Sequence, residues 1–232
     1  MNNGNRLFLF DIDCTLLLTG GVGREATRCA MEEIFGTSSR LDAHQFGGKT
    51  DWQTLVELLD EHGYDESRIG EVMHHYEDAM QRHMTRVIDA FPVRACPGAI
   101  ELARTLHEES QMMGIVTGNV STTAPIKLRA AGFDPAWFPV GAYGNEARDR
   151  DRLPPLALTR AIQHYGRHIL PSEVIVIGDT PADIACARAL GAVAVAVRTG
   201  FCTEAELAAA QPDFLLDDLT AFRATFSLEE PQ

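Results

Sequence analysis

The sequence has few lysines and no excess of positive charge. Its 232 residues include only Lys49 and Lys127, and 33 acidic residues outnumber the 20 lysines and arginines, which gives a formal net charge of −13. A chain this acidic lacks the broad cationic face that would neutralise a nucleic-acid backbone or an anionic membrane. We therefore expect no nucleic acid and no membrane among its partners.

Cysteines are few, and long apolar runs are absent. The cysteines form no C-x-x-C pair, which predicts neither a zinc site nor a redox couple; they are Cys14, Cys29, Cys96, Cys186 and Cys202. No stretch of about 18 uncharged apolar residues could span a membrane, and no basic region precedes an apolar run at the N-terminus. We expect a cytoplasmic protein.

What the sequence does contain is a set of short apolar runs separated by helix-like segments. The runs lack the alternation of half-exposed strands, so each is predicted to be covered on both faces; they are Leu7–Phe10, Gly114–Val116, Val174–Ile177 and Ala192–Val197, with Phe214–Leu216 as an edge strand. The helical segments are Ala99–Ser110, Thr122–Ala131, Pro154–Tyr165 and Asp183–Leu190. This order predicts an α/β fold with a doubly wound, Rossmann-like parallel sheet.

One interval departs from this order. Ala26, Ala30 and Ile34 have helical spacing, and a second apolar helix ends near Gly63, without a buried strand between them. We therefore predict an all-helical cap over residues 20–91, inserted into an α/β core of residues 1–19 and 92–232. Pro97-Gly98 marks the return to the core.

Two aspartates follow the first apolar run. Asp11-Ile12-Asp13-Cys14-Thr15 comes directly after Leu7–Phe10, and ligands of open α/β sheets bind at the carboxyl ends of the strands. One of the two carboxylates can act as a nucleophile and the other as an acid and base.

A second acidic segment follows Val174–Ile177 in the same way and contributes Asp179 and Asp183. Four carboxylates at one sheet edge repel one another unless a divalent cation neutralises them, and oxygen ligands favour Mg²⁺. The sequence therefore predicts a Mg²⁺ site.

A third strand end carries Thr117-Gly118-Asn119. Its hydroxyl, backbone amide and side-chain amide suit phosphoryl oxygens. Each of these groups also has an ordinary interpretation, because aspartate and threonine at strand ends often cap a helix or a turn. Their occurrence at three strand ends favours a phosphoryl-transfer site.

With these motifs the sequence resembles the haloacid dehalogenase-like hydrolase superfamily, in particular its phosphatase branch near phosphoglycolate phosphatase and β-phosphoglucomutase. The resemblance rests on Asp11–Thr15, Thr117–Asn119, Gly178–Asp183 and a helical insertion before Pro97-Gly98. It implies a Mg²⁺-dependent phosphatase that hydrolyses a small phosphomonoester, with a small phosphorylated metabolite as its partner.

The resemblance also implies roles for the aspartates. Asp11 would attack the phosphorus to form an aspartyl-phosphate, and Asp13 would protonate the leaving oxygen and then activate water. Mg²⁺ would be held by the Asp11 carboxylate, the Asp13 backbone carbonyl and the Asp179 carboxylate, and Asp183 would support the ion either as a further ligand or through another ligand.

The remaining polar groups would surround the phosphoryl group. Thr117, the amide of Gly118 and Asn119 would bind it, and Thr15 would steady the loop. Cys14 stands where the family usually has glycine, and we expect the turn to accept it because cysteine is small.

Two residues are candidates for the cation that neutralises the nucleophile. The family often has lysine in a Lys-Pro-x-Pro segment, where this chain has Arg152-Leu153-Pro154-Pro155. Arg152 is one candidate, although an arginine fork and a lysine point charge are not equivalent. We favour Lys127, which follows Thr117 by one short helix and is the only lysine outside the cap.

Residues of the cap are candidates for contact with the organic part of the substrate. Arg24 begins the first cap helix, and Lys49 lies in Gly47-Gly48-Lys49-Thr50-Asp51, which resembles a substrate-specificity loop. Both can equally be solvated surface charges.

Several other functions are weighed against the phosphatase. Ala43-x-x-x-x-Gly48-Lys49-Thr50 fails as a P-loop at Ala43, and Gly21-x-Gly23-x-x-Ala26 fails as a dinucleotide-binding turn because it is separated from the strand. A sugar-phosphate mutase of the same superfamily is the main alternative. A phosphonate hydrolase using Lys49, or a non-catalytic phosphate sensor, is less favoured. The chain is expected to be a monomer or a homodimer.

Overall fold

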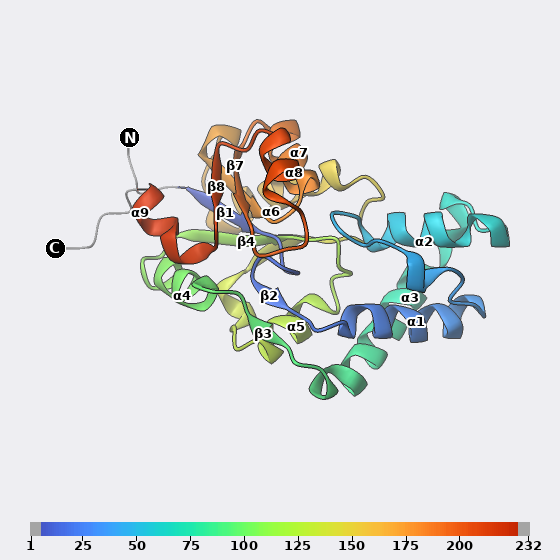
Figure 1. Cartoon of the computed structure of the whole chain (residues 1–232). Coiled ribbons are helices and arrows are strands. Elements are labelled where there is room, and N and C mark those ends of the chain that lie inside the picture. Colours follow the sequence, from blue (N-terminus) through green and yellow to red (C-terminus); the bar gives the residue numbers. More distant parts are fainter. Residues whose placement is uncertain (1–5, 227–232) are drawn as a thin grey trace.

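A six-stranded parallel sheet forms the centre of the computed structural model, which describes residues 6–226 (Figure 1). The spatial order is β5-β4-β1-β6-β7-β8, and every neighbouring pair is parallel. The strands are β1 (Leu7–Phe10), β4 (Met112–Val116), β5 (Val140–Ala142), β6 (Val174–Gly178), β7 (Val193–Val197) and β8 (Phe214–Leu216). The predicted doubly wound parallel sheet is confirmed.

Strand β1 lies between two apolar layers, which explains its unbroken hydrophobic run. Phe8 and Phe10 pack on one side of the sheet, and Leu7 and Leu9 pack on the other. The first side is covered by α4 (Ala99–Glu108), α5 (Ala124–Ala130) and α9 (Phe222–Phe226). The second is covered by α6 (Leu153–Tyr165), α7 (Pro181–Leu190) and α8 (Glu204–Ala209).

Three strands were not predicted from the sequence. Strand β5 has only three residues with Gly141 at its centre, so its apolar run is too short to stand out. Strands β2 (Leu17–Leu18) and β3 (Arg94–Ala95) have two residues each and pair antiparallel. This two-stranded ribbon joins the segment that leaves the core before the cap to the segment that returns to the core after it.

Helices α1 (Val22–Phe35), α2 (Asp51–Leu59) and α3 (Glu66–Val87) fill the predicted insertion. They project from one end of the sheet in Figure 1 and have an apolar cluster of their own, centred on the fully buried Tyr76. Val120, which follows β4, packs into this cluster. The predicted core of residues 1–19 and 92–232 also includes residues 1–5 and 227–232, which lie outside the described part.

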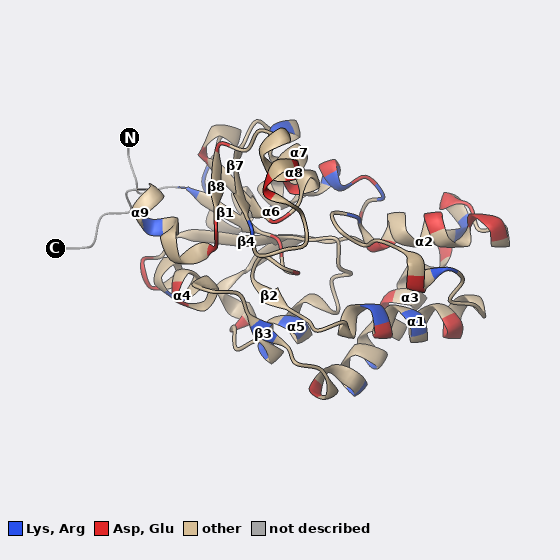
Figure 2. Ribbon diagram, viewed as in Figure 1, with Lys and Arg blue, Asp and Glu red and all other residues tan. Residues whose placement is uncertain are grey.

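Charged residues of both signs are interspersed along the helices in Figure 2. Several are paired on the cap, as Arg28 is with Asp42 and Arg82 with Glu33. Among residues 6–226, no helix is both long enough and apolar enough to cross a membrane.

Candidate active site

The sheet topology brings three polar segments to one edge. Phe10 lies beside Ile115 of β4 and Ile177 of β6, so the residues that follow these three strands are neighbours. The Asp11 amide donates to the Ile177 carbonyl at 2.9 Å, which fixes the turn after β1 against β6. This edge is the carboxyl end of the central strands, as the sequence predicts.

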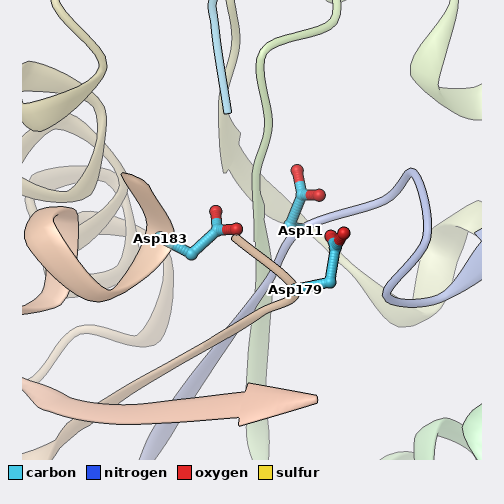
Figure 3. A group of neighbouring side chains, drawn as sticks. All are labelled: Asp11, Asp179 and Asp183. Atoms are coloured by element: carbon cyan, nitrogen blue, oxygen red, sulfur yellow. The ribbon is translucent and has the colours of Figure 1, made fainter. Parts of the chain in front are cut away.

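Three buried carboxylates meet there. Each of Asp11, Asp179 and Asp183 offers one carboxylate oxygen, and these oxygens all lie within 4.8 Å of one another. Figure 3 shows the three side chains next to one another. Their exposed fractions are 6%, 4% and 3%. Three of the four predicted carboxylates are therefore brought together, from two strand ends and the first turn of α7, and Asp13 is not in this group.

Burial and the repulsion of neighbouring carboxylates make Asp11 and Asp179 difficult to ionise. Burial raises the pKa of Asp11 to about 7, with Arg150 opposing the shift and the charge of Asp183 adding to it. Burial likewise raises the pKa of Asp179 to about 8, with further repulsion from Asp183 and Asp11. An all-oxygen group with this excess of negative charge suits a hard divalent cation.

Arg150 is the cation that contacts the predicted nucleophile. Its Nη2 donates to Oδ1 of Asp11 at 3.0 Å and also to Asp183. The side chain is 7% exposed, and its Nε is buried without a hydrogen-bond partner among the described residues. Its Nη1 lies 3.4 Å from the position that a β-carbon on Gly118 would occupy.

Arg150 was not among the two sequence-based candidates for this position, Arg152 and Lys127, and neither of them forms an ion pair with Asp11 among the described residues. Arg152 is exposed, two residues beyond Arg150 in a single 3₁₀ turn. The match of Pro155 to the last proline of the family's Lys-Pro-x-Pro pattern selects Arg152, whereas the turn directs Arg150 inward. A residue two positions away in a tight turn cannot be chosen from spacing alone.

Lys127 instead pairs with Asp13. Its Nζ lies 2.8 and 3.0 Å from the two oxygens of Asp13 and 2.5 Å from Oδ1 of Asn119. Asn119 completes the triangle by donating its Nδ2 to Asp13 at 2.7 Å. Lys127 is 3% exposed although it is a lysine on a helix. Asp13 is thereby held apart from the cluster around Asp11.

The hydroxyls take supporting positions. Thr15 donates to Oδ1 of Asp179 at 3.1 Å, which agrees with its predicted place in the loop. Thr117 is fully buried and accepts from Nδ2 of Asn119 at 2.7 Å. Gly118 has no room for a side chain, because a β-carbon there would come within 1.9 Å of the Lys49 carbonyl oxygen.

The two cap residues proposed for substrate contact bind within the cap. Arg24 donates to the carbonyls of Leu41 and His44, and its guanidinium stacks 4.7 Å from the Phe46 ring centre. Lys49 pairs with Glu57. The structure brings neither side chain to the aspartate cluster.

Sequence reasoning missed the loop after β7. A β-carbon on Gly200 would lie 1.8 Å from Oδ2 of Asp179, so this loop covers the carboxylate directly. Thr199 donates to the carbonyl of Cys14 at 2.5 Å. The signal was present, because Thr199-Gly200 closely follows an apolar strand just as Thr117-Gly118 does.

Cys14 has the left-handed backbone that the family's glycine implies. Its φ is 66°, a region where a side chain is strained. The turn therefore accepts a β-carbon, as expected.

Comparisons with known proteins agree with this geometry. A family model described as HAD-hydrolase-like matches residues 152–222. The chain is 30% identical to the phosphoglycolate phosphatase of Synechococcus elongatus over 60% of its own length and 62% of that enzyme. It is 29% identical to a 5'-nucleotidase of Pseudomonas aeruginosa over 93% of its own length and 92% of that enzyme.

The chain is similar in sequence to haloacid dehalogenase-like hydrolases, with phosphatases among them. Solved structures share its fold: a hydrolase from Pseudomonas syringae has a TM-score of 0.66 at 21% identity, covering 96% of this chain and 99% of that one. A haloacid dehalogenase-like family hydrolase from Streptococcus pneumoniae has a TM-score of 0.62 at 21% identity, with the same coverage. The chain spans less than two thirds of the Synechococcus phosphatase and about half, 52%, of those from Vibrio vulnificus.

Proposed function

We propose that this chain is a Mg²⁺-dependent phosphatase that hydrolyses a small phosphorylated metabolite in the cytoplasm through an aspartyl-phosphate. The observation that carries the proposal is the buried trio of Asp11, Asp179 and Asp183, with Arg150 bonded to Asp11. Phosphatases and a 5'-nucleotidase among the relatives support the same reaction class.

The proposed first step is transfer of the phosphoryl group to the protein. An oxygen of Asp11 attacks the phosphorus, and the bond from phosphorus to the leaving oxygen breaks. Asp13 donates a proton to that oxygen, which requires it to exchange its Lys127 contact for the substrate. In the second step Asp13 removes a proton from water, which attacks the phosphorus and releases Asp11.

The remaining residues would stabilise charge on the phosphoryl oxygens. The Nε of Arg150, which is buried without a partner among the described residues, and the amide of Gly118 would donate to such oxygens. The carboxylates of Asp11, Asp179 and Asp183 and the carbonyl of Asp13 would hold Mg²⁺. When bound, the ion would offset the repulsion between the carboxylates and the phosphoryl group.

The alternatives carry less support. The phosphoglycolate phosphatase and the 5'-nucleotidase that match this chain in sequence are both hydrolases by name. These matches do not favour the mutase. A phosphonate hydrolase would require a free cap lysine, and Lys49 pairs with Glu57.

Release of p-nitrophenol from p-nitrophenyl phosphate tests the proposal. We expect release with Mg²⁺, loss of release with EDTA, and loss in Asp11→Asn. Asp60→Asn, at an exposed site in the cap, is the matched control and should behave as wild type. Release that persists in Asp11→Asn would contradict an aspartyl-phosphate at this residue.

A further inference from the structure

Two amides in the first turn of α2 donate hydrogen bonds to backbone carbonyls of the core. The amide of Asp51 donates to the Gly118 carbonyl at 2.8 Å, and the amide of Trp52 donates to the Gly144 carbonyl at 3.1 Å. The first amides of a helix have no partner within it. Here two of them are satisfied by carbonyls from two separate core loops.

Side chains of the same turn bind these loops a second time. Oδ2 of Asp51 accepts the amide of Val120 at 2.9 Å, and the Thr50 hydroxyl donates to the Arg148 carbonyl at 2.7 Å. Thr50 at the same time accepts the amide of Gln53, so it caps α2 in the ordinary way. Four hydrogen bonds therefore join three consecutive cap residues to the core.

Close backbone approach shows that this contact needs glycine. A β-carbon on Gly48 would lie 2.6 Å from the Ala182 β-carbon. A β-carbon on Gly144 would lie 1.7 Å from the Gly118 carbonyl oxygen and 2.9 Å from the Asp51 amide nitrogen. Side chains at these positions would hold the cap loop away from the core.

Asp51 occupies a site that is unfavourable for a carboxylate. It is 8% exposed, and burial raises its pKa to about 6 although the charge of Lys127 opposes the shift. Burial of a carboxylate lowers stability unless hydrogen bonds compensate, and those hydrogen bonds can hold a backbone turn in one conformation. The geometry fixed here is the turn at Val120, directly after Asn119.

We propose that Thr50, Asp51 and Trp52 form a latch through which the position of the cap sets the phosphoryl-binding loops, with Asp51 as a positioning residue. The latch holds the loop that carries Gly118 and Asn119, and the loop that leads to Arg150. Asp51 would bind no substrate. The proposal rests on the proposed function, because these loops are the ones assigned to phosphoryl binding there.

The test compares Asp51→Ala, which removes the acceptor for the Val120 amide, with Asp51→Asn, which keeps one. Asp60→Ala is the control on the same part of the cap. Hydrogen exchange of full-length protein is followed in segments 48–54 and 117–121, and orthovanadate binding is measured with Mg²⁺. We expect Asp51→Ala to exchange faster in both segments and to bind orthovanadate about tenfold more weakly. Asp51→Asn and Asp60→Ala should stay close to wild type.

Two results would overturn the latch. Unchanged exchange in 117–121 and unchanged orthovanadate binding in Asp51→Ala would show that the cap does not set this loop. A loss in Asp51→Asn as large as in Asp51→Ala would show that the hydrogen-bond acceptor is not what matters. Exchange does not depend on turnover. Faster exchange in Asp51→Ala, found together with a wild type that hydrolyses no phosphoester, would therefore contradict the proposed function and leave the physical latch standing.

Discussion

Arg150 donates from a single nitrogen to both Asp11 and Asp183, and so links the end of β1 to the start of α7. Both carboxylates belong to the cluster that would hold the cation. The arginine therefore balances one side of this cluster, while its Nη1 lies 3.4 Å from the position that a β-carbon on Gly118 would occupy. Its Nε is buried without a hydrogen-bond partner among the described residues. A lysine would supply one point charge in place of this fork.

Replacing Arg150 should impair both catalysis and folding. We expect Arg150→Met to lower kcat/KM for p-nitrophenyl phosphate by about 100-fold, because charge on the phosphoryl group loses its partner. It should also lower the free energy of unfolding by about 3 kcal/mol, since buried carboxylates lose their counter-ion. Arg152→Met is the control and should change both quantities little. Equal losses in the two variants would contradict the placement of Arg150.

Replacing Lys127 should affect the acid and base. Lys127→Met keeps the volume of the side chain and leaves Asp13 with Asn119 alone, so we expect kcat to fall about tenfold or more. Arg129→Met, on the exposed side of the same helix, provides the comparison. Steady-state rates and thermal unfolding of both variants are measured together. An active Lys127→Met enzyme with wild-type kcat would show that the ion pair does not orient Asp13.

The raised pKa values of Asp11 and Asp179, about 7 and about 8, predict how stability depends on pH without metal. The folded protein binds protons more tightly than the unfolded chain does, so this stabilisation is complete below about pH 4 and is lost between pH 4 and 8. The free energy of unfolding in EDTA should therefore decrease from pH 5.5 to 8.5.

Mg²⁺ should reverse this loss, because an ion that binds only the folded protein stabilises it. At pH 8 we expect the melting temperature to rise with Mg²⁺, and Asp179→Asn to remove most of the rise. Denaturation in urea at several pH values, with EDTA or Mg²⁺, provides the measurement. A pH profile that does not respond to Mg²⁺ would argue against a metal site at these carboxylates.

Cys14 offers a separate test of backbone strain. A non-glycine residue at a φ of 66° is strained by about 1 to 2 kcal/mol, and the greater freedom of glycine in the unfolded chain offsets part of any gain. We expect Cys14→Gly to raise the free energy of unfolding by about 0.5 to 1 kcal/mol. Cys14→Ala removes the thiol and keeps the β-carbon, so it should give no such gain.

The sheet and the acidic cluster could be predicted because short-range patterns determine them. An apolar run followed by Asp11, Thr117 or Asp179 predicts a buried strand and its carboxyl end. This pattern lies within a few residues and does not depend on contacts with the rest of the chain. The residue that contacts Asp11 could not be found in this way. Arg150 and Arg152 have the same chemistry, and one tight turn decides which of them is buried.

The role of Asp51 was beyond sequence reasoning for a different reason. Its loop was identified, but its contacts with Gly118 and Val120 depend on how two separately packed parts meet. Strand β5 was missed because three residues around Gly141 carry almost no pattern. The sequence therefore missed a contact between distant segments, the choice between two arginines in one turn, and a strand too short to form a pattern.

The β2–β3 ribbon determines how the core and the cap are connected. Leu18 and Arg94 lie opposite each other in an antiparallel pair. The segment that enters the cap and the segment that leaves it are therefore hydrogen-bonded to each other at the border of the core. In the topology of the chain, the helical insertion takes the place of the loop that connects the two strands of a β-hairpin. The length and shape of the cap can therefore change without a shift of any strand in the main sheet. The same aspartate cluster at the sheet edge can thus be covered by a different cap.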